Sequence, residues 1–263
     1  MSKTVEIVRP ILLQMRPISL DEMSSVKLMK RNDTKYVTNV SKLIELLELV
    51  RHSYFIQEID GNPISQYRTL YWDTPDKHHY FLIHEQGRKP RVKVRMRQYV
   101  NTNVAFLEIK RKDNHGKTRK RRVKIPFYSG LESNSYTGED FLQEELGITF
   151  KDLIATTSNS FSRITLVNFE KTERVTIDFD LEFYNNETRQ SHALPHNVII
   201  ELKRDGRTSS PLLAILRQLR IKPSGFSKYV IGSALTNPDL RQNRLKLRMR
   251  HYEKIAKQSV PQT

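Results

Sequence analysis

The stretch from Arg88 to Lys124 reads RKPRVKVRMRQYVNTNVAFLEIKRKDNHGKTRKRRVK. It holds fifteen Lys or Arg residues and two acids, a local charge of +13, whereas the whole chain of 263 residues carries +16. Charged and apolar residues alternate in three of its segments, PRVKVRMRQY (90–99), AFLEIKRK (105–112) and RKRRVKIPF (119–127). Successive side chains on a strand point to opposite faces. The alternation therefore predicts three strands, each with a charged face and an apolar face.

Similar patterns outside this stretch predict further strands at 31–38, 66–74, 161–170, 173–183 and 197–205. Helices are predicted at 42–52 after a Ser41 cap, and at 76–85, 139–146, 151–156, 210–221, 227–235 and 239–257. Residues 184–196 are predicted to form a polar loop, and Pro10 and Pro17 argue against one continuous helix in residues 1–30. The fold class expected is α+β, an eight-stranded antiparallel β-barrel with helices packed outside. We expect one domain over residues 1–263, with the helices of 210–257 packed on the barrel.

Composition narrows the range of functions. The chain has no Cys, which excludes disulfides, thiolate catalysis and Cys-based zinc sites. No apolar run approaches the roughly 20 residues needed to span a bilayer, and the first residues lack the pattern of a secretory signal. A cytoplasmic location is therefore expected. A pI near 9.9 indicates an anionic partner: nucleic acid, an anionic membrane surface or a phosphate-rich molecule.

Strands with one charged and one apolar face allow two arrangements, with the charges facing either water or the lumen of the barrel. Three observations favour the lumen. The predicted amphipathic helices need an apolar sheet surface to cover. The acids Glu108, Asp178 and Glu201 share faces with the cations. Cations recur on six predicted strands, and their mutual repulsion is tolerable where an anion binds. The sequence thus predicts a tunnel that binds a polyanion.

The motifs that carry a family resemblance follow one another along about 200 residues. The chain resembles the polyphosphate polymerase domain of the vacuolar transporter chaperone (VTC) family, within the triphosphate tunnel metalloenzyme superfamily. The matching segments are KRNDTKYV (30–37), YRTLYWDTPD (67–76), HEQGRKPRVKVRMRQY (84–99), FLEIKRK (106–112), RKRR (119–122), ERVTIDFDL (173–181), IIELKRD (199–205) and GFSKY (225–229). Each motif is weak alone, and their ordered set is specific.

The resemblance implies an eight-stranded tunnel that binds the triphosphate of a nucleotide. It implies that the residues taking part in transfer are Lys35, Arg95, Arg97, Lys110, Arg174 and Lys228. It also implies substrate contacts from Arg88, Arg122 and Arg163, and Lys93 and Lys203 join them as cations of the same strand faces. Glu201 matches the family's metal-binding glutamate, and Glu108 is the second choice as a ligand for Mn²⁺ or Mg²⁺. Asp178 and Asp180 receive no role.

Two departures from the family pattern bear on the activity. Residues 31–35, RNDTK, stand where the triphosphatase branch has alternating Glu-x-Glu-x-Lys, which favours a polymerase over a hydrolase. The chain also lacks the phosphate-sensing N-terminal domain and the membrane segments of the eukaryotic proteins. Control by inositol phosphates and coupling to a membrane channel are therefore not expected of this sequence.

The expected activity is ATP-dependent polyphosphate polymerisation. The substrates are ATP or another nucleoside triphosphate, with polyphosphate, triphosphate or pyrophosphate. The alternatives are a metal-dependent triphosphatase, a non-enzymatic polyphosphate sensor and a nucleic-acid binder, the last disfavoured by the interleaved acids. A basic C-terminal helix also allows contact with an anionic membrane or a membrane-protein partner. Four of the site residues have an ordinary alternative: Lys35, Arg95 and Arg97 as solvated strand residues, and Glu201 as an ion-pair partner of Lys203 or an arginine.

Overall fold

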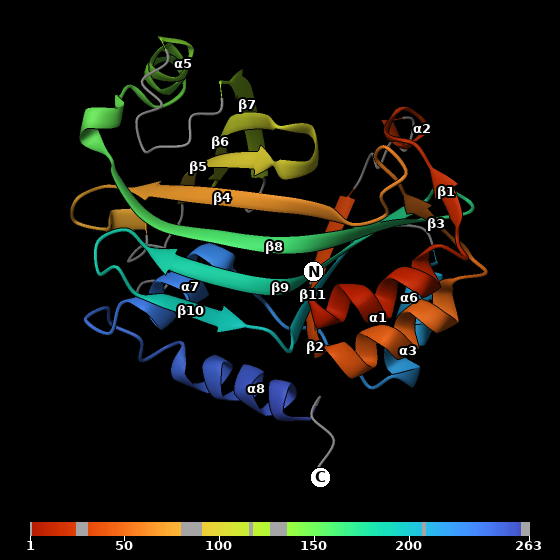
Figure 1. Cartoon of the computed structure of the whole chain (residues 1–263). Coiled ribbons are helices and arrows are strands. Elements are labelled where there is room, and N and C mark those ends of the chain that lie inside the picture. The colour runs from red at the N-terminus through yellow and green to blue at the C-terminus, as the bar shows by residue number, and fades with distance from the viewer. Residues whose placement is uncertain are drawn as a thin grey trace.

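The computed structural model describes residues 2–24, 31–79, 91–115, 118–126, 136–206 and 209–258, and it is built around one large curved sheet. Eight strands follow one another across this sheet in the order β2-β11-β9-β8-β4-β5-β6-β7 (Figure 1), and every pair of neighbours is antiparallel. Their bounds are β2 Arg31–Asn39, β4 Ser65–Asp73, β5 Arg91–Tyr99, β6 Val104–Lys112, β7 Thr118–Ile125, β8 Ile154–Asn168, β9 Glu173–Asn185 and β11 Asn197–Asp205.

Three short strands extend the sheet, and helices surround it. The short strands are β1 Arg16–Ile18, β3 Tyr54–Gln57 and β10 Ser191–Leu194. The helices are α1 Lys3–Leu12, α2 Leu20–Ser24, α3 Val40–Val50, α5 Tyr136–Leu146, α6 Pro211–Gln218, α7 Lys228–Thr236 and α8 Lys246–Lys257, with short 3₁₀ turns at Val100–Thr102 and Phe150–Asp152. No described helix has both the length and the apolar character required to cross a membrane.

The sheet curls until strands far apart in its order meet. Lys35 on β2 donates from Nζ to the carbonyl of Phe226 at 2.9 Å, and Lys93 on β5 donates to Oγ of Ser227 at 3.0 Å. Four strands separate β2 from β5 in the sheet, yet both lysines reach consecutive residues of the chain. Within the described ranges, β2 and β7 do not pair, so the curved sheet keeps two edges. The α+β fold with a charged concave side is confirmed.

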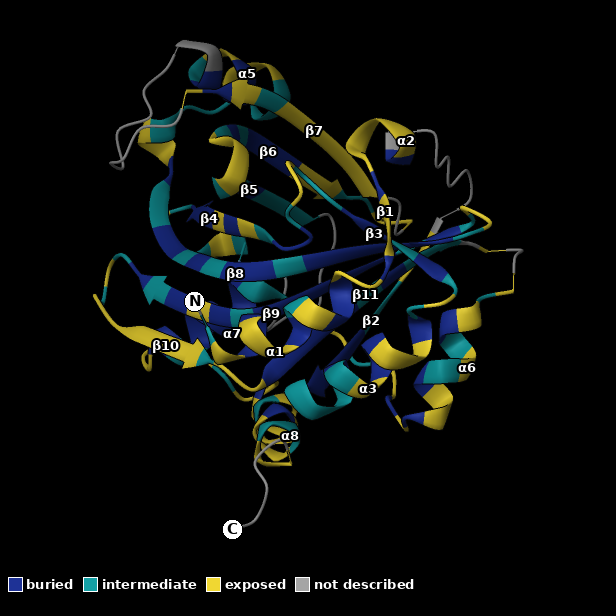
Figure 2. Cartoon of the chain, turned by 45° about the vertical axis from the view of Figure 1, so that its right-hand side comes forward, coloured by how far each residue is buried: buried dark blue, intermediate teal, exposed yellow. Residues whose placement is uncertain are grey.

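The convex side of the sheet carries the apolar faces of the strands. Tyr36, Ile200, Ile177 and Ile164 lie side by side on β2, β11, β9 and β8, and they belong to a core closed by α1, α3 and α6. Leu70, Met96 and Leu107 continue this face on the other strands, where α5 covers it. Burial of these faces under helices stabilises the sheet, and Figure 2 shows β9 and β11 as largely buried strands. The charged faces of the strands lie on the concave side.

Helix α7 departs from the expectation that the helices pack outside. Its residues Tyr229 and Val230 share a core with Tyr67, Phe161 and Ile199, which are residues of the concave faces. Gly232 allows this close approach, because a Cβ there would lie 2.4 Å from the ring of Phe183. Of the predicted C-terminal helices, α6 therefore packs on the convex side and α7 on the concave side.

Several predicted elements differ in detail. The N-cap of α3 is Asn39 and not Ser41, because Oδ1 of Asn39 accepts a hydrogen bond from the Lys42 N–H at 3.0 Å. Residues 151–156 form no helix, since a 3₁₀ turn ends at Asp152 and β8 begins at Ile154. The predicted loop at 184–196 contains β10, and α8 begins later than expected, at Lys246.

Two more expectations concern the N-terminal third of the chain. Pro10 does not end α1, which continues to Leu12. Proline lacks an N–H, but near the end of a helix this costs a single hydrogen bond. Most of the helix expected at 76–85 lies outside the described residues, and residues 78 and 79 are helical.

Candidate anion-binding tunnel

Charged side chains from six strands and α7 converge on the concave side of the sheet. The strand register places Lys35 beside Glu201, Arg163 beside Asp178, Arg95 beside Glu108, Lys93 beside Lys110, and Arg174 beside Lys203. We call the following residues the tunnel cluster: Lys35, Lys93, Arg95, Arg97, Lys110, Arg163, Arg174, Lys203 and Lys228 with Glu108, Asp178 and Glu201. Opposite walls of the cluster act on one another, since burial lowers the pKa of Lys110 on β6 and the charge of Glu201 on β11 opposes this shift.

Asp178 organises two of the cations. Its carboxylate accepts from Nε and Nη2 of Arg163 at 2.5 and 2.8 Å, and also from Nζ of Lys228. Burial alone would raise the pKa of Asp178, but Arg163 and Lys228 outweigh it and hold this pKa well below its usual range. Asp178 thus stays ionised and fixes a helix residue against β8 and β9. Sequence reasoning gave Asp178 no role, although its position on the charged face of β9 was visible.

Glu108 is fully engaged by the tunnel wall. Its side chain is 1% exposed and forms ion pairs with Arg95 at 2.6 Å and with Lys120 at 2.5 Å. Burial opposes ionisation, yet Arg95, Arg97 and Lys120 lower the pKa of Glu108 to about 2. A carboxylate held in this way fits a structural role in the wall better than metal coordination. Lys120 was not among the predicted site residues, although it shares a face with Arg122.

Glu201 is the carboxylate best placed to hold a metal ion. Its side chain is 20% exposed and lies 3.3 Å from Lys203, and Lys203 and Lys35 overcome burial to lower the pKa of Glu201 to about 2. No group of three or more metal-ligating side chains occurs among the residues that the structure describes. Mg²⁺ is commonly held by one or two carboxylates together with substrate phosphates, so a lone Glu201 fits a metal that arrives with its substrate.

Arg97 is buried without a carboxylate partner among the described residues. It is 8% exposed, and its closest polar contact is a long one, 3.4 Å from Nε to Oγ1 of Thr69. The guanidinium lies over the rings of Tyr67 and Phe161, at 5.6 and 5.9 Å from their centroids. Burial and the charges of Arg95 and Arg163 lower the pKa of Arg97. A cation in this setting is poised for an anion that enters the tunnel.

Asn159 on β8 adds a neutral polar group to the concave face. It lies next to Thr69 on the concave face, is 4% exposed, and neither polar atom of its amide has a hydrogen-bond partner within the described part of the chain. Buried amides are normally paired, so this one is available to a ligand. Sequence reasoning missed Asn159, although its alternation with Phe161 and Arg163 on one strand indicated this face.

Two lysines of the tunnel cluster titrate near neutral pH. Burial lowers the pKa of Lys93 to about 7, and the charges of Lys35 and Lys110 act in the same direction. Burial also lowers the pKa of Lys228 to about 7, despite the opposing attraction of Asp178. A bound polyanion would favour the charged form of both lysines.

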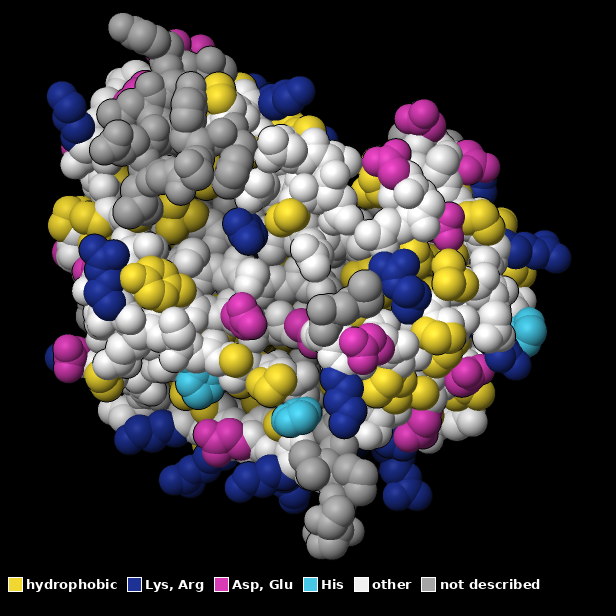
Figure 3. All heavy atoms as spheres, viewed as in Figure 1, with side chains coloured by type: hydrophobic (Ala, Val, Ile, Leu, Met, Phe, Trp, Pro, Cys, Tyr) yellow, Lys and Arg dark blue, Asp and Glu magenta, His cyan; other side chains and the backbone are white. Residues whose placement is uncertain are grey.

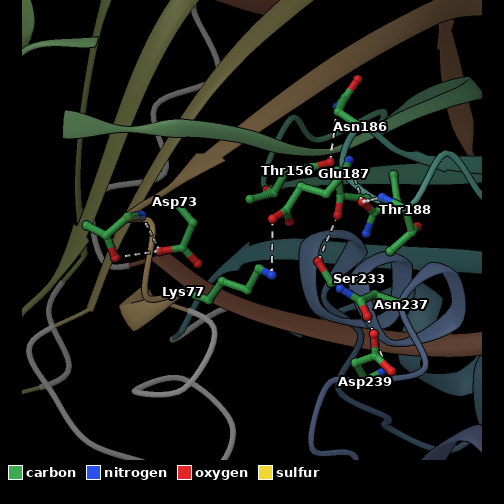
Figure 4. Close-up of polar contacts among 12 residues, drawn as sticks. Asp73, Lys77, Thr156, Asn186, Glu187, Thr188, Ser233, Asn237 and Asp239 are labelled. Carbon is green, nitrogen blue, oxygen red and sulfur yellow. Dashed lines mark hydrogen bonds and ion pairs between the residues drawn. The ribbon is translucent and has the colours of Figure 1, made fainter. Parts of the chain in front are cut away.

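Contacts along α7 hold Lys228 in place. Ser233 and Thr157 share a hydrogen bond of 2.8 Å, and Tyr229 donates its hydroxyl to buried Asp73 at the end of β4. Beyond the helix end, Thr188 donates to the carbonyl of Thr236 at 2.6 Å, and this loop is tied to the 74–77 turn by an ion pair of 3.2 Å between Lys77 and Glu187 (Figure 4). The helix is therefore fixed along its length.

The structure brings together most of the predicted site residues. The tunnel cluster contains every one of them except Arg88, which lies outside the described residues, and Arg122. Arg122 lies on the same face of edge strand β7 but is exposed, with its guanidinium 4.5 Å from the centroid of Phe106. It belongs to the rim of the tunnel.

The curved sheet and this cluster define a protein whose concave side is lined mainly by cations. The profile of the VTC domain family matches residues 30–237, and the chain belongs to this family. No curated protein matches the chain.

Three solved structures show a general likeness. A candidate adenylate cyclase from Bacillus halodurans has 15% identity and a TM-score of 0.46, covering 76% of this chain and 96% of that one. A candidate adenylyl cyclase from Hippeastrum, described as having a dominant triphosphatase activity, has 15% identity and a TM-score of 0.48, with coverage of 82% and 100%. A candidate adenylate cyclase from Vibrio parahaemolyticus has 14% identity and a TM-score of 0.43, with coverage of 78% and 99%. These similarities are too low to carry an argument, and the family assignment rests on the VTC domain match.

Proposed function

We propose that this chain is an ATP-dependent polyphosphate polymerase. In the proposed reaction a terminal phosphate oxygen of a growing chain attacks the γ-phosphorus of ATP. A new P–O–P bond forms, the bond from the γ-phosphorus to the β–γ bridging oxygen breaks, and ADP leaves. Membership of the VTC domain family supports a function on triphosphate or polyphosphate, and a cytoplasmic location, where ATP is at hand, belongs to the same proposal.

The observation that carries the proposal is the imbalance of charge inside the tunnel. The tunnel cluster holds nine cations and three carboxylates, and Glu108 and Asp178 each bind two cations already. Arg97 remains buried without an acid in the described structure. Such repulsion weakens the folded protein unless an anion neutralises it, and phosphoryl transfer needs this kind of neutralisation of the phosphate oxygens.

The residues of the cluster then act by position and charge. Arg97 and Arg163 offer planar guanidinium forks to phosphate oxygens, and Lys35 supplies a point charge from the facing strand. Glu201 would hold Mg²⁺ or Mn²⁺, and the ion would add neutralising charge on the phosphate oxygens. The tunnel fixes the nucleophile and the γ-phosphate in line, which supplies much of the rate enhancement.

The same wall favours transfer to phosphate over transfer to water. A triphosphatase gains from a base or a positioning group that activates water. Glu108 and Asp178 are held by cations, and their low pKa values make them weak bases. A terminal phosphate is already anionic and needs no base. These two carboxylates therefore favour the polymerase, whereas Lys93 and Lys228, with pKa values of about 7, are the groups that a triphosphatase would use as a base.

Incubation of the protein with ATP and Mn²⁺, followed by gel analysis of the products, tests this function. We expect a ladder of polyphosphate with ADP formed in equal measure to the phosphate incorporated. ADP and free phosphate without a ladder would replace the polymerase with a triphosphatase. Tight, salt-sensitive binding of tripolyphosphate without turnover in any metal would identify a sensor.

A further inference from the structure

A second basic cavity lies on the convex side of the β6–β7 hairpin, outside the tunnel. It has a volume of about 550 Å³ and is lined by Ile109, Arg111, Arg119, Lys120, Arg121 and Glu145. The register places Ile109 beside Arg121 and Arg111 beside Arg119. These positions alternate with Glu108, Lys110 and Lys120, so the three arginines lie on the face away from the tunnel cluster. Figure 2 shows β7 as an exposed strand, and its contact with α5 borders the cavity.

The charges of this cavity are not balanced. It has three arginines and one carboxylate, Glu145, which lies 3.1 Å from Nε of Arg121, whereas the fourth cationic residue, Lys120, is paired with Glu108 on the tunnel side. Arg111 donates to the main-chain oxygen of Glu145, so these two arginines also hold the last turn of α5. Arg119 has no carboxylate within ion-pair distance in the described structure and stands directly opposite Arg111. Like charges in a cross-strand pair destabilise a sheet, so anchoring of α5 does not account for Arg119.

We propose that this cavity binds an oligophosphate, an anion with several adjacent phosphate groups, at a site separate from the tunnel. Guanidinium groups bind phosphate oxygens through two parallel hydrogen bonds. Arg119 and Arg121 are two residues apart on one strand, about 7 Å along its axis. At this spacing they would bind different phosphate groups of the same anion. Exposure of these side chains leaves the site open to solution, and the bound anion would relieve the repulsion between Arg111 and Arg119.

Titration of the full chain with tripolyphosphate tests the proposal. We expect two classes of binding site in the unmodified protein, the weaker one in the cavity. The double variant Arg119→Gln/Arg121→Gln should lose this weaker class by tenfold or more in affinity and keep the tunnel site. Arg248→Gln/Arg250→Gln on exposed α8 removes the same charge elsewhere and should leave both classes in place.

Three outcomes would overturn the cavity site. A single class of sites in the unmodified protein is one, and an equal loss in the α8 control is another, because it would indicate a general effect of net charge. Lower thermal stability of Arg119→Gln/Arg121→Gln with unchanged binding would show that the arginines only anchor α5. Binding is measured without nucleotide or turnover, so the result is independent of whether the chain is a polymerase.

Discussion

Arg97 is the residue whose setting is hardest to explain without a ligand. We expect Arg97→Gln to weaken tripolyphosphate binding about tenfold or more, since hydrogen bonds to a charged partner contribute roughly 1.5–3 kcal/mol. The same change should leave the melting temperature unchanged or raise it, because it removes a buried charge that has no acid partner in the described structure. Titration calorimetry measures the binding of tripolyphosphate, and scanning calorimetry measures the melting temperature. Arg97→Lys is the control, and a large loss of stability in Arg97→Gln with normal binding would contradict the assignment.

Lys93 and Lys228 predict how binding responds to pH. Both have a pKa of about 7 in the protein, below the ordinary value for lysine, so both lose protons above neutral pH. A polyanion favours their charged forms, so tripolyphosphate binding at pH 8 should take up protons and its affinity should fall from pH 7 to 9. Titration calorimetry in buffers with different ionisation enthalpies measures this uptake. Lys93→Met should reduce it, and proton release by the unmodified protein would contradict the account.

Substitutions of Glu201 and Glu108 should have different effects, because Glu201 is proposed as the metal ligand and Glu108 as a structural residue of the tunnel wall. Glu201→Gln should abolish metal-dependent turnover and keep most of the metal-free affinity for tripolyphosphate, because Glu201, 20% exposed, is the carboxylate proposed to meet the metal. Glu108→Gln should chiefly lower stability, by roughly 3–5 kcal/mol, since it leaves Arg95 and Lys120 without their shared acid. Turnover against Mn²⁺ concentration and thermal melts distinguish them. Equal metal dependence in both variants would refute this division.

At the scale of the element, α7 is the part of the site most sensitive to packing. Gly232→Ala places a Cβ 2.4 Å from the ring of Phe183 and should destabilise the protein by about 1–3 kcal/mol. It should also reduce turnover, because Lys228 sits on the same helix. Gly225→Ala is the matched control, since nothing lies within 4 Å of its Cβ. Thermal melts and the polymerisation assay measure both effects, and equal behaviour of the two variants would remove α7 from the site.

The sequence predicted the positions and faces of the strands more accurately than the positions of the helices. Alternation in 90–99 and 105–112 identifies the charged faces, because burial under helices requires every second residue to be apolar. The 3₁₀ turn at Phe150–Asp152 was mistaken for a helix because a short polar segment offers no periodicity that distinguishes the two. The place of α7 on the concave side depends on the fit of Gly232 against Phe183, a contact between distant segments that local pattern does not encode.

The same limit applies to the site. The two-residue alternation of the strands and the family motifs predicted which charged residues face the tunnel. The sequence did not indicate which acids remain free to bind a metal, because Glu108 and Glu201 stand in similar motifs, LEIK and IELK. Their difference arises from Arg95 on β5 and Lys120 on β7, which the two strands that flank β6 bring to Glu108.

For the whole molecule, the distribution of the net charge of +16 determines which anions the protein can bind. On the face shown in Figure 3, Lys and Arg side chains are interspersed with Asp and Glu, whereas the tunnel cluster concentrates cations on the concave side. The site proposed for the tunnel cluster takes a single chain of phosphates, which a DNA duplex does not present. We therefore expect DNA at equal phosphate concentration to leave tripolyphosphate bound, as measured by competition with a labelled ligand. Displacement by DNA would indicate an external nucleic-acid surface.

The central claim is that the charged strand faces enclose a phosphate chain. A crystal structure of the protein grown with tripolyphosphate tests this most directly. The account predicts phosphate groups between β2 and β5, with oxygens within hydrogen-bonding distance of Lys35, Arg97 and Arg163. A structure in which bound phosphates occupy only the outer surface, with the tunnel cluster contacting none of them, would contradict it.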